Sequence, residues 1–212
     1  MFNLHTHHYT ATPNCIELVN QYPWEFDAAA PIYSIGIHPW FIDAQQWKLH
    51  LEIVDQHLIK SGCWAIGECG LDKRIEVPFA LQLEVFEAHL LLAEQYQKPV
   101  VLHLVGAFQE LIALKNKHNC TVPLIVHGFS KNTQLAQELV KHGFYLSFGK
   151  YLLRNPELKE AFLAVPEQNI FLETDTMEES IADVYAKAAA YRNLEVSELE
   201  RRIERNRVKV FG

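Results

Sequence analysis

Phe2-Asn3-Leu4-His5-Thr6-His7 is a short apolar run that ends in two histidines separated by one residue. In a β-strand, side chains two residues apart point to the same face of the sheet. The imidazoles of His5 and His7 are therefore expected to converge on one point, as a pair of metal ligands must. Two histidines at this spacing also occur by chance in cores and on surfaces, so the pair alone does not separate metal binding from packing.

The same arrangement recurs along the chain, because four further strand-like runs end in a histidine or an acidic residue. These runs are Ala65–Glu68, Val100–His103, Leu124–His127 and Ile170–Asp175. In a barrel of parallel strands, functional side chains gather at the carboxyl ends of the strands. The recurrence therefore predicts a metal site at one end of such a barrel.

Eight runs have the composition of parallel strands covered on both faces, since they are largely apolar and mostly lack strict alternation. They cover residues 2–7, 15–22, 32–37, 63–68, 99–104, 123–127, 144–149 and 169–174. Helical spacing of apolar residues occupies 41–61, 79–97, 107–119, 131–142, 156–164, 178–192 and 196–210, the last with an expected capping box of Ser197 and Glu200. The alternation predicts the α/β class, and eight strands predict a TIM (β/α)8-type barrel.

The first two connections are too short for this pattern. About seven residues (8–14) join the first two strands and about nine (23–31) join the next two, whereas a helical crossover needs about a dozen or more. Seven extended residues reach roughly 24 Å, just enough to return along a strand of roughly 17–20 Å. We therefore predict a shortened barrel that lacks its first two outer helices. The bared strands then need a cover, either the C-terminal helix or a second subunit, so the chain is expected to be a monomer or a homodimer.

Length and composition fit one soluble globular domain over residues 1–212. The chain is 49% hydrophobic and 21% charged, with no apolar run near the ~20 residues of a membrane span. No leader pattern precedes the first strand and the four cysteines form no C-x-x-C pair, so a cytoplasmic protein without membrane contacts is expected. The net charge of −7 disfavours broad electrostatic capture of nucleic acid.

Six candidate ligands offer nitrogen and oxygen donors and no sulfur: His5, His7, Glu68, His103, His127 and Asp175. One metal ion cannot use all six and keep a position open for water, so two ions that share a carboxylate are predicted, with Glu68 as the bridge. Two divalent cations carry more charge than two carboxylates remove, which suits an anionic substrate. Imidazole-rich sites suit zinc, manganese or iron, whereas magnesium prefers oxygen ligands but remains an option.

Several stretches in order along the whole chain resemble the TatD-related metal-dependent hydrolases, a family of amidohydrolase-like barrels. The matching stretches are His5-Thr6-His7, Gly36–Pro39, Ala65–Asp72, Gln82–Phe86 with Pro99–His103, His127–Ser130, Glu173–Asp175 and Asn206–Phe211. The resemblance implies that His5, His7, Glu68 and Asp175 bind one metal ion and that Glu68, His103 and His127 bind the other.

The resemblance also implies a reaction. Asp175 would orient or deprotonate the attacking water, with Glu68 as the other catalytic carboxylate. Members of the family are described as deoxyribonucleases that often cut DNA from the 3′ end, so hydrolysis of a phosphodiester at a DNA 3′ end is expected.

Three departures from the family pattern affect substrate binding. Asn3 replaces the usual aspartate, and His103 is followed by leucine and valine where the family has serine and arginine. After Asp175 the usual substrate loop is replaced by Thr176-Met177-Glu178. Lys73 and Arg74 could supply substitute phosphate contacts or belong to a solvated turn.

The remaining assignments leave alternatives open. His38 could contact substrate or hold a loop carbonyl, and Glu173 is expected to orient a ligand. Trp40, Trp47, Trp64 and Phe86 are expected in the core, and the histidines of the helices, among them His57 and His89, on the surface. Two other functions stay in view. One is a small-molecule hydrolase, either a phosphoesterase acting on a small phosphate ester or an amidohydrolase, and the other is a catalytically silent metal-binding protein.

Overall fold

A computed structural model describes residues 1–212, and all eight predicted strands are present in it. The strands are β1 (Phe2–Thr6), β2 (Ile16–Gln21), β3 (Tyr33–Ile35), β4 (Cys63–Asp72), β5 (Val100–Val105), β6 (Leu124–Val126), β7 (Tyr145–Phe148) and β8 (Ile170–Leu172). They form one sheet whose strand order follows the chain from β1 to β8, with parallel pairing. This topology confirms the predicted TIM (β/α)8-type fold.

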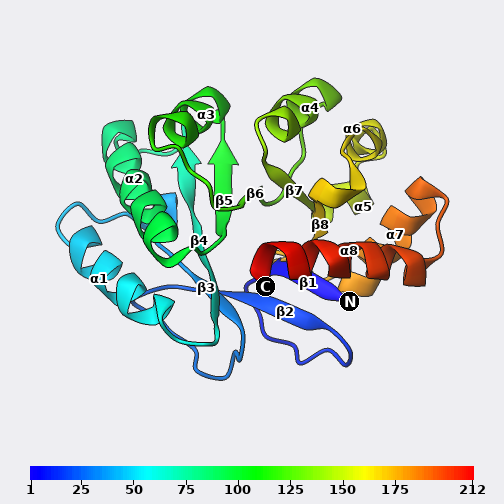
Figure 1. The fold of residues 1–212 in the computed structure, drawn as a ribbon, viewed down its shortest axis with the longest axis horizontal. Coiled ribbons are helices and arrows are strands. Elements are labelled where there is room, and N and C mark those ends of the chain that lie inside the picture. The colour runs from blue at the N-terminus through cyan, green and yellow to red at the C-terminus, as the bar shows by residue number, and fades with distance from the viewer. The chain divides into compact units, whose positions relative to one another are not determined.

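The helices also follow the predicted pattern (Figure 1). They are α1 (Trp47–Leu58), α2 (Phe79–Tyr96), α3 (Phe108–Lys117), α4 (Thr133–Lys141), α5 (Lys150–Arg154), α6 (Leu158–Ala164), α7 (Ile181–Arg192) and α8 (Val196–Phe211). Short 3-10 helices η1 (Pro39–Phe41) and η2 (Glu167–Asn169) and the five-residue α5 were not expected. No helix lies between β1 and β2 or between β2 and β3, which confirms the shortened barrel.

The chain divides into two compact units, the first of which combines Met1–Val19 with Ile125–Gly212. In this unit α8 lies along β1 and β8 (Figure 1). The Phe211 ring contacts the rings of Phe2 and Phe171 at centroid distances of 5.5 and 6.0 Å. The C-terminal helix is therefore the cover of β1, one of the two covers that the sequence predicts.

In the second unit, Asn20–Leu124, β3 is covered by the preceding loop and by α1 and not by a crossover helix. The Tyr33 hydroxyl lies 3.0 Å from Nδ1 of His57 on α1, and the Tyr33 ring packs edge-on against Phe26 from the preceding loop. A loop residue and the next helix thus bury the strand that the missing helix would otherwise cover. His57 is consequently buried, and its expected place on the surface is wrong.

The strand β4 runs four residues past the predicted end at Glu68, as far as Asp72. Its pairing with β5 contains a bulge, because Ile66 pairs with Val100 whereas Cys69 pairs with Leu102. Gly70 allows this close pairing, since it has φ +145° and a Cβ atom there would lie 2.0 Å from the His103 carbonyl oxygen. Bulges redirect side chains, and Glu68 lies within this one.

The expected capping box at Ser197 is wrong. The helix α8 begins at Val196, so Ser197 lies inside its first turn and Glu195 is the N-cap residue. A capping box instead begins α7, where Ser180 and Asp183 bond reciprocally to each other's backbone N–H. The sequence rule missed this box because its third position holds aspartate in place of glutamate or glutamine.

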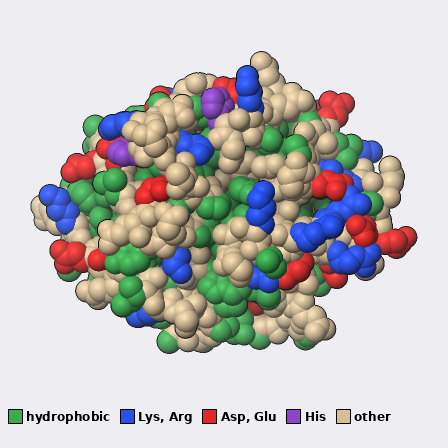
Figure 2. Space-filling view, in the orientation of Figure 1, with side chains coloured by type: hydrophobic (Ala, Val, Ile, Leu, Met, Phe, Trp, Pro, Cys, Tyr) green, Lys and Arg blue, Asp and Glu red, His purple; other side chains and the backbone are tan.

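The outer side of α8 is charged, and its inner side is apolar. Leu199, Ile203 and Val210 are buried, while Arg202 and Arg207 pair with glutamates one turn earlier on the helix. Figure 2 shows Lys, Arg, Asp and Glu side chains interspersed over this helix. Partly exposed ion pairs on a helix surface contribute little stability, so the apolar side holds the helix in place. None of the helices combines the length and apolar content that crossing a bilayer requires.

A completely buried histidine supports the loop after β3. Nε2 of His89 on α2 accepts a hydrogen bond from the Ile37 N–H at 3.1 Å, which leaves Nδ1 to donate to the Val85 carbonyl at 2.8 Å. Burial lowers the pKa of His89 from 6.5 to about 4. The expected surface position of His89 is therefore wrong, because this histidine faces the sheet.

This burial predicts a pH-dependent stability. Between pH 6.5 and pH 4 the unfolded chain binds a proton at His89 that the folded chain does not, so stability falls as pH falls. When the pH falls from 7 to 5, the free energy of unfolding, measured with urea, should decrease by about 2 kcal/mol more in the wild type than in His89→Gln. His8→Gln, at an exposed histidine, should keep the wild-type dependence. Equal pH dependence in wild type and His89→Gln would contradict the assignment.

Asn3 ties β1 to the segment after β8 within the first unit. Its Nδ2 donates to Oγ1 of Thr174 at 2.8 Å, and its Oδ1 accepts from the Thr174 N–H at 3.0 Å. An aspartate could accept both bonds if the threonine hydroxyl turned to donate. This exchange explains how asparagine can stand at a position where the family has aspartate.

Asn3→Ala should lower the free energy of unfolding by about 1–3 kcal/mol, because it removes both buried bonds. Asn3→Asp should retain most of the stability at pH 7, where the carboxylate accepts from the N–H and the hydroxyl of Thr174. Urea unfolding of the two variants measures the difference. Equal losses would show that the reciprocal bond does not stabilise this segment.

Candidate metal centre

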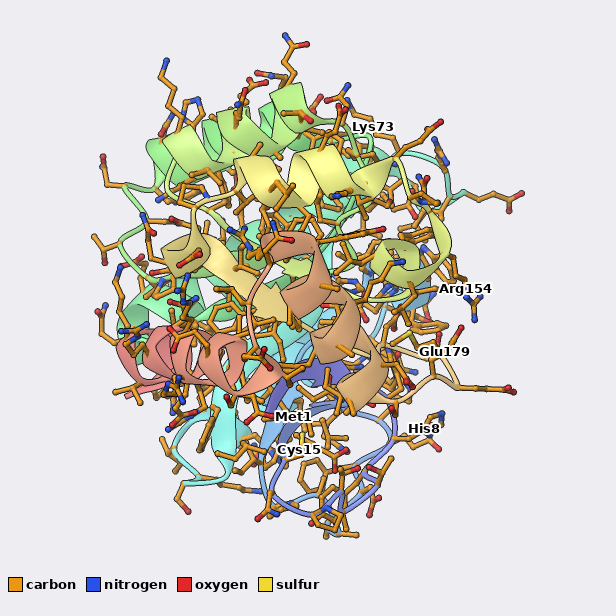
Figure 3. All side chains as sticks on the ribbon, turned by 90° about the vertical axis from the view of Figure 1, so that its right-hand side faces the viewer. Met1, His8, Cys15, Lys73, Arg154 and Glu179 are labelled. Carbon is orange, nitrogen blue, oxygen red and sulfur yellow. The ribbon has the colours of Figure 1, made fainter.

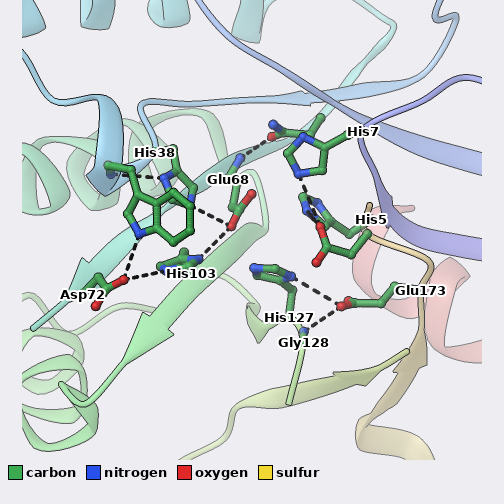
Figure 4. A network of polar contacts seen from close by, with 12 residues as sticks. His5, His7, His38, Glu68, Asp72, His103, His127, Gly128 and Glu173 are labelled. Atoms are coloured by element: carbon green, nitrogen blue, oxygen red, sulfur yellow. Dashed lines mark hydrogen bonds and ion pairs between the residues drawn. The ribbon is translucent and has the colours of Figure 1, made fainter. Parts of the chain in front are cut away.

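The first unit brings four of the six predicted ligands together. Nε2 of His5 and Nε2 of His7 lie 3.7 and 3.4 Å from Oδ1 of Asp175. The rings of His5 and His127 lie 4.5 Å apart (Figure 4). The donor atoms of His5, His127 and Asp175 all lie within 4.8 Å of one another. This spacing and the nitrogen and oxygen donors fit a divalent cation.

Backbone bonds fix this arrangement. Asp175 follows β8 with φ +53°, a left-handed conformation in which aspartate is over-represented. Its N–H donates to the His5 carbonyl at 2.9 Å, and its own carbonyl accepts from the His7 N–H at 3.2 Å. The Asp175 backbone therefore connects the two histidines, which places its side chain beside both imidazoles.

Glu173 orients the third histidine of this unit. Its Oε1 accepts a hydrogen bond from the Gly128 N–H at 2.7 Å and lies 3.4 Å from Nδ1 of His127 (Figure 4). Burial would raise the pKa of the Glu173 carboxyl, but the His127 hydrogen bond and the charges of His127 and His5 outweigh it, so the pKa is lowered. A buried carboxylate that holds a ligand imidazole is a common companion of metal sites. The contacts agree with the expected orienting role.

The second unit places Glu68 between two imidazoles. Oε1 of Glu68 lies 2.9 Å from Nδ1 of His103 and 3.1 Å from Nε2 of His38, and the side chain is 3% exposed. The Glu68 N–H donates to Oδ1 of Asn20 at 2.6 Å, which fixes the bulged backbone. The donor atoms of His38, Glu68 and His103 lie within 4.8 Å of one another. His38, expected at the substrate, therefore belongs to a group that could itself hold a cation.

Asp72 and Trp40 extend this group. Oδ2 of Asp72 accepts from the Trp40 indole N–H at 2.8 Å and lies 3.3 Å from Nε2 of His103. Burial would raise the pKa of Asp72, but hydrogen bonds from Trp40, the Arg74 N–H and His103 outweigh it, so the pKa is lowered. Gln82 holds this end of β4 by accepting from the Asp72 N–H and donating to the Asp72 carbonyl.

The two candidate phosphate contacts are partly engaged elsewhere. Nζ of Lys73 forms an ion pair with Glu110 on α3 and lies 5.3 Å from the centre of the Phe79 ring. The Arg74 N–H donates to Oδ1 of Asp72, and its side chain is exposed. Figure 3 shows Lys73 on the surface, together with the exposed ion pair of Arg154 and Glu179.

Sequence reasoning missed two contributors to this site. Asp72 was not among the predicted site residues because the predicted strand ended at Glu68, whereas β4 continues to Asp72. Trp40 was expected in the core, yet it is 55% exposed, so that prediction is wrong. A signal was available: Trp40 lies two residues after His38 at the end of a strand, where side chains face the site and not the core.

Comparison with known proteins identifies the family. The family model described as TatD related DNase matches residues 1–212. The 3′-5′ ssDNA/RNA exonuclease TatD of Citrobacter koseri is 30% identical over 167 residues, which are 76% of this chain and 63% of that protein. The uncharacterized metal-dependent hydrolase YabD of Bacillus subtilis is 30% identical over 165 residues, 76% of this chain and 62% of that protein. The chain thus spans somewhat less than two thirds of these relatives.

Solved structures share the fold. YjjV, a TatD homologue from Escherichia coli, superposes with a TM-score of 0.84 at 21% identity, over 100% of this chain and 97% of that chain. The phosphotriesterase homology protein from Escherichia coli gives a TM-score of 0.70 at 15% identity, over 93% and 83% of the two chains. These structures share the fold, and the family model that matches all 212 residues shows that the chain belongs to the TatD-related DNase family.

Proposed function

We propose that the ligand groups of the two units together form one binuclear metal site. The proposed ligands are His5, His7, Glu68, His103, His127 and Asp175. The support is the fold, because the carboxyl ends of all eight strands of a TIM barrel lie at the same end. Glu68 would be the ligand that both ions share, and residues 1–212 would act as a single catalytic domain, since each unit alone carries only part of the ligand set.

The proposed reaction is hydrolysis of a phosphodiester bond by an activated water. Divalent cations, when bound, lower the pKa of water and neutralise charge that develops on the phosphoryl oxygens. Asp175, whose side chain is 33% exposed, accepts the proton of the attacking water and orients it. Glu68, which is 3% exposed, is shielded from solvent, and its proposed role is to keep the metal ions in place. Zinc or manganese suits these imidazole-rich donors best, with magnesium or iron as further options.

The proposed substrate is the 3′ end of a DNA strand. The observation that carries this proposal is the two groups of carboxylate and imidazole donors, each with its donor atoms within 4.8 Å of one another, together with the family membership. The Citrobacter koseri relative is named an exonuclease on single-stranded DNA and RNA, and the phosphotriesterase homology protein was solved with phosphate in its active site. His38, Lys73 and Arg74 are the proposed substrate contacts, with Lys73 shared between phosphate and Glu110.

A small phosphate ester is the second candidate substrate. Leu104 and Val105 follow His103 where the family has an arginine that could hold phosphate, and the chain carries a net charge of −7. Both features weaken the capture of a polyanion and matter less for a single small ester. The third candidate function is that of a catalytically silent metal-binding protein, which would bind metal but show no turnover.

Removal of the central carboxylates tests the reaction. Glu68→Gln and Asp175→Asn should each lower the manganese-dependent cleavage of a single-stranded oligonucleotide by about 100-fold or more, because each removes a metal ligand and Asp175→Asn also a proton acceptor. Glu160→Gln, at an exposed acid of α6, is the matched control. Full metal-dependent activity in either site variant would exclude the proposed mechanism. Elemental analysis of each protein measures the loss of metal separately.

Substrate choice is tested on the wild-type protein. Manganese-dependent release of nucleotides from a free 3′ end, abolished by a chelator, is the expected result. Cleavage of p-nitrophenyl phosphate without release from DNA would favour the small-ester candidate. Bound metal without turnover on either substrate would leave only the silent protein.

A further inference from the structure

Exposed aromatic side chains gather after β2 and β3 in the second unit. Trp24, Trp40 and Phe41 are 40%, 55% and 49% exposed, and we call them the aromatic rim. Trp24 follows the carboxyl end of β2, and the other two belong to η1, after the carboxyl end of β3. These strand ends are the ones that carry functional side chains in this fold. Large aromatic rings exposed at such a position call for an explanation beyond core packing.

The rim is held rigidly. Tyr22 stacks on one face of Trp24, with ring centroids 5.0 Å apart and an angle of 10° between the planes. The Phe41 ring meets Trp24 and Tyr22 edge-on at 5.9 and 5.6 Å. The Trp40 indole N–H is fixed by its bond to Asp72. The ring of His50 on α1 also contacts Trp24, at 5.0 Å and an interplanar angle of 48°. The rings are therefore held in place, and the exposed fractions show that part of each surface is still open to solvent.

Ring contacts connect the rim to the proposed metal ligands. Phe41 lies 5.5 Å from the ring of His38, and His38 lies 4.4 Å from the ring of His103. Trp40 contacts both of these histidines, at 5.2 and 5.7 Å. A chain fragment bound at the metal ligands would therefore extend directly over the rim.

Few substrate chemistries fit flat, exposed rings beside an acidic surface. Base–aromatic stacking needs no positive charge and tolerates every base, since each base has a π-face. In a duplex the faces of the bases are occupied by their neighbours, so only unpaired bases can use such rings. The net charge of −7 disfavours capture of phosphates over a broad basic face.

We propose that the aromatic rim is a binding site for unpaired nucleobases, which stack on Trp24, Phe41 and Trp40 and thereby place the adjoining phosphodiester at the metal ligands. The inference rests on the proposed hydrolysis of a phosphodiester and adds the residues that hold its substrate. It makes base stacking the main source of affinity, without preference for base identity. Binding should therefore depend on the presence of bases near the strand end.

The test compares two oligonucleotides, one with normal bases and one whose last nucleotides are abasic. Binding is measured by anisotropy with Asp175→Asn protein, so that no cleavage is needed. The normal strand should bind about 10-fold more tightly than the abasic one. Trp24→Ala and Phe41→Ala should reduce this preference, and their double variant should abolish it. Trp24→Phe and Phe41→Tyr should restore it, whereas Leu91→Ala, at an exposed apolar residue of α2, should leave it unchanged.

Cleavage supplies the second readout on otherwise wild-type protein. The alanine variants should raise KM for the normal strand and leave cleavage of the abasic strand unchanged. Equal binding of both strands by the parent protein, or an equal loss on both in the alanine variants, would overturn the stacking site. If binding depends on the bases but neither the wild type nor any variant cleaves the strand, the stacking site would be supported and the proposed hydrolysis rejected.

Discussion

The burial of the Glu68 carboxylate is the constraint on which the centre depends. An ionised carboxylate that is 3% exposed is costly unless opposite charge or hydrogen-bond donors surround it. His38 and His103 lie within 3.1 Å of one of its oxygens, and a divalent cation would balance the charge more completely. The bulge in β4 is what turns this side chain toward the two imidazoles. The flanking glycines are required because the backbone of β5 passes too close for a Cβ atom.

The missing helices after β1 and β2 explain the exposed aromatic residues in the connection between β2 and β3. Without helices after β1 and β2, the connection from β2 to β3 is a loop that holds Tyr22, Trp24 and Phe26. Phe26 of this loop packs against Tyr33 of β3, and Trp24, two residues earlier, is exposed beside Phe41. The absence of these helices therefore leaves space both for Phe26, which packs on β3, and for the aromatic rim. A loop can place side chains near strand ends at little cost in chain length.

Periodicity predicted the fold, because it depends on local rules, whereas metal binding by the residues at the strand ends stays a prediction. Apolar runs located all eight strands, and the residues that end them include every predicted ligand. Features that depend on contacts between elements were missed. The extension of β4 to Asp72 follows from pairing with β5, the burial of His89 from the loop at Ile37, and the exposure of Trp40 from its bond to Asp72. None of these partners is close in sequence, so no pattern within a single element reveals them.

The proposed cleavage of a polyanion requires this acidic protein to attract its substrate at a few fixed points. The proposed cations would do so at the scissile phosphate, where the field of a bound ion is strongest. Stacking on fixed rings would do so along the rest of the strand, since it does not weaken as salt increases in the way that phosphate contacts do. Lys73, already paired with Glu110, adds little long-range attraction. The proposed metal ions and aromatic rings would together replace a basic groove, which would reconcile the net charge of −7 with the proposed nucleic-acid substrate.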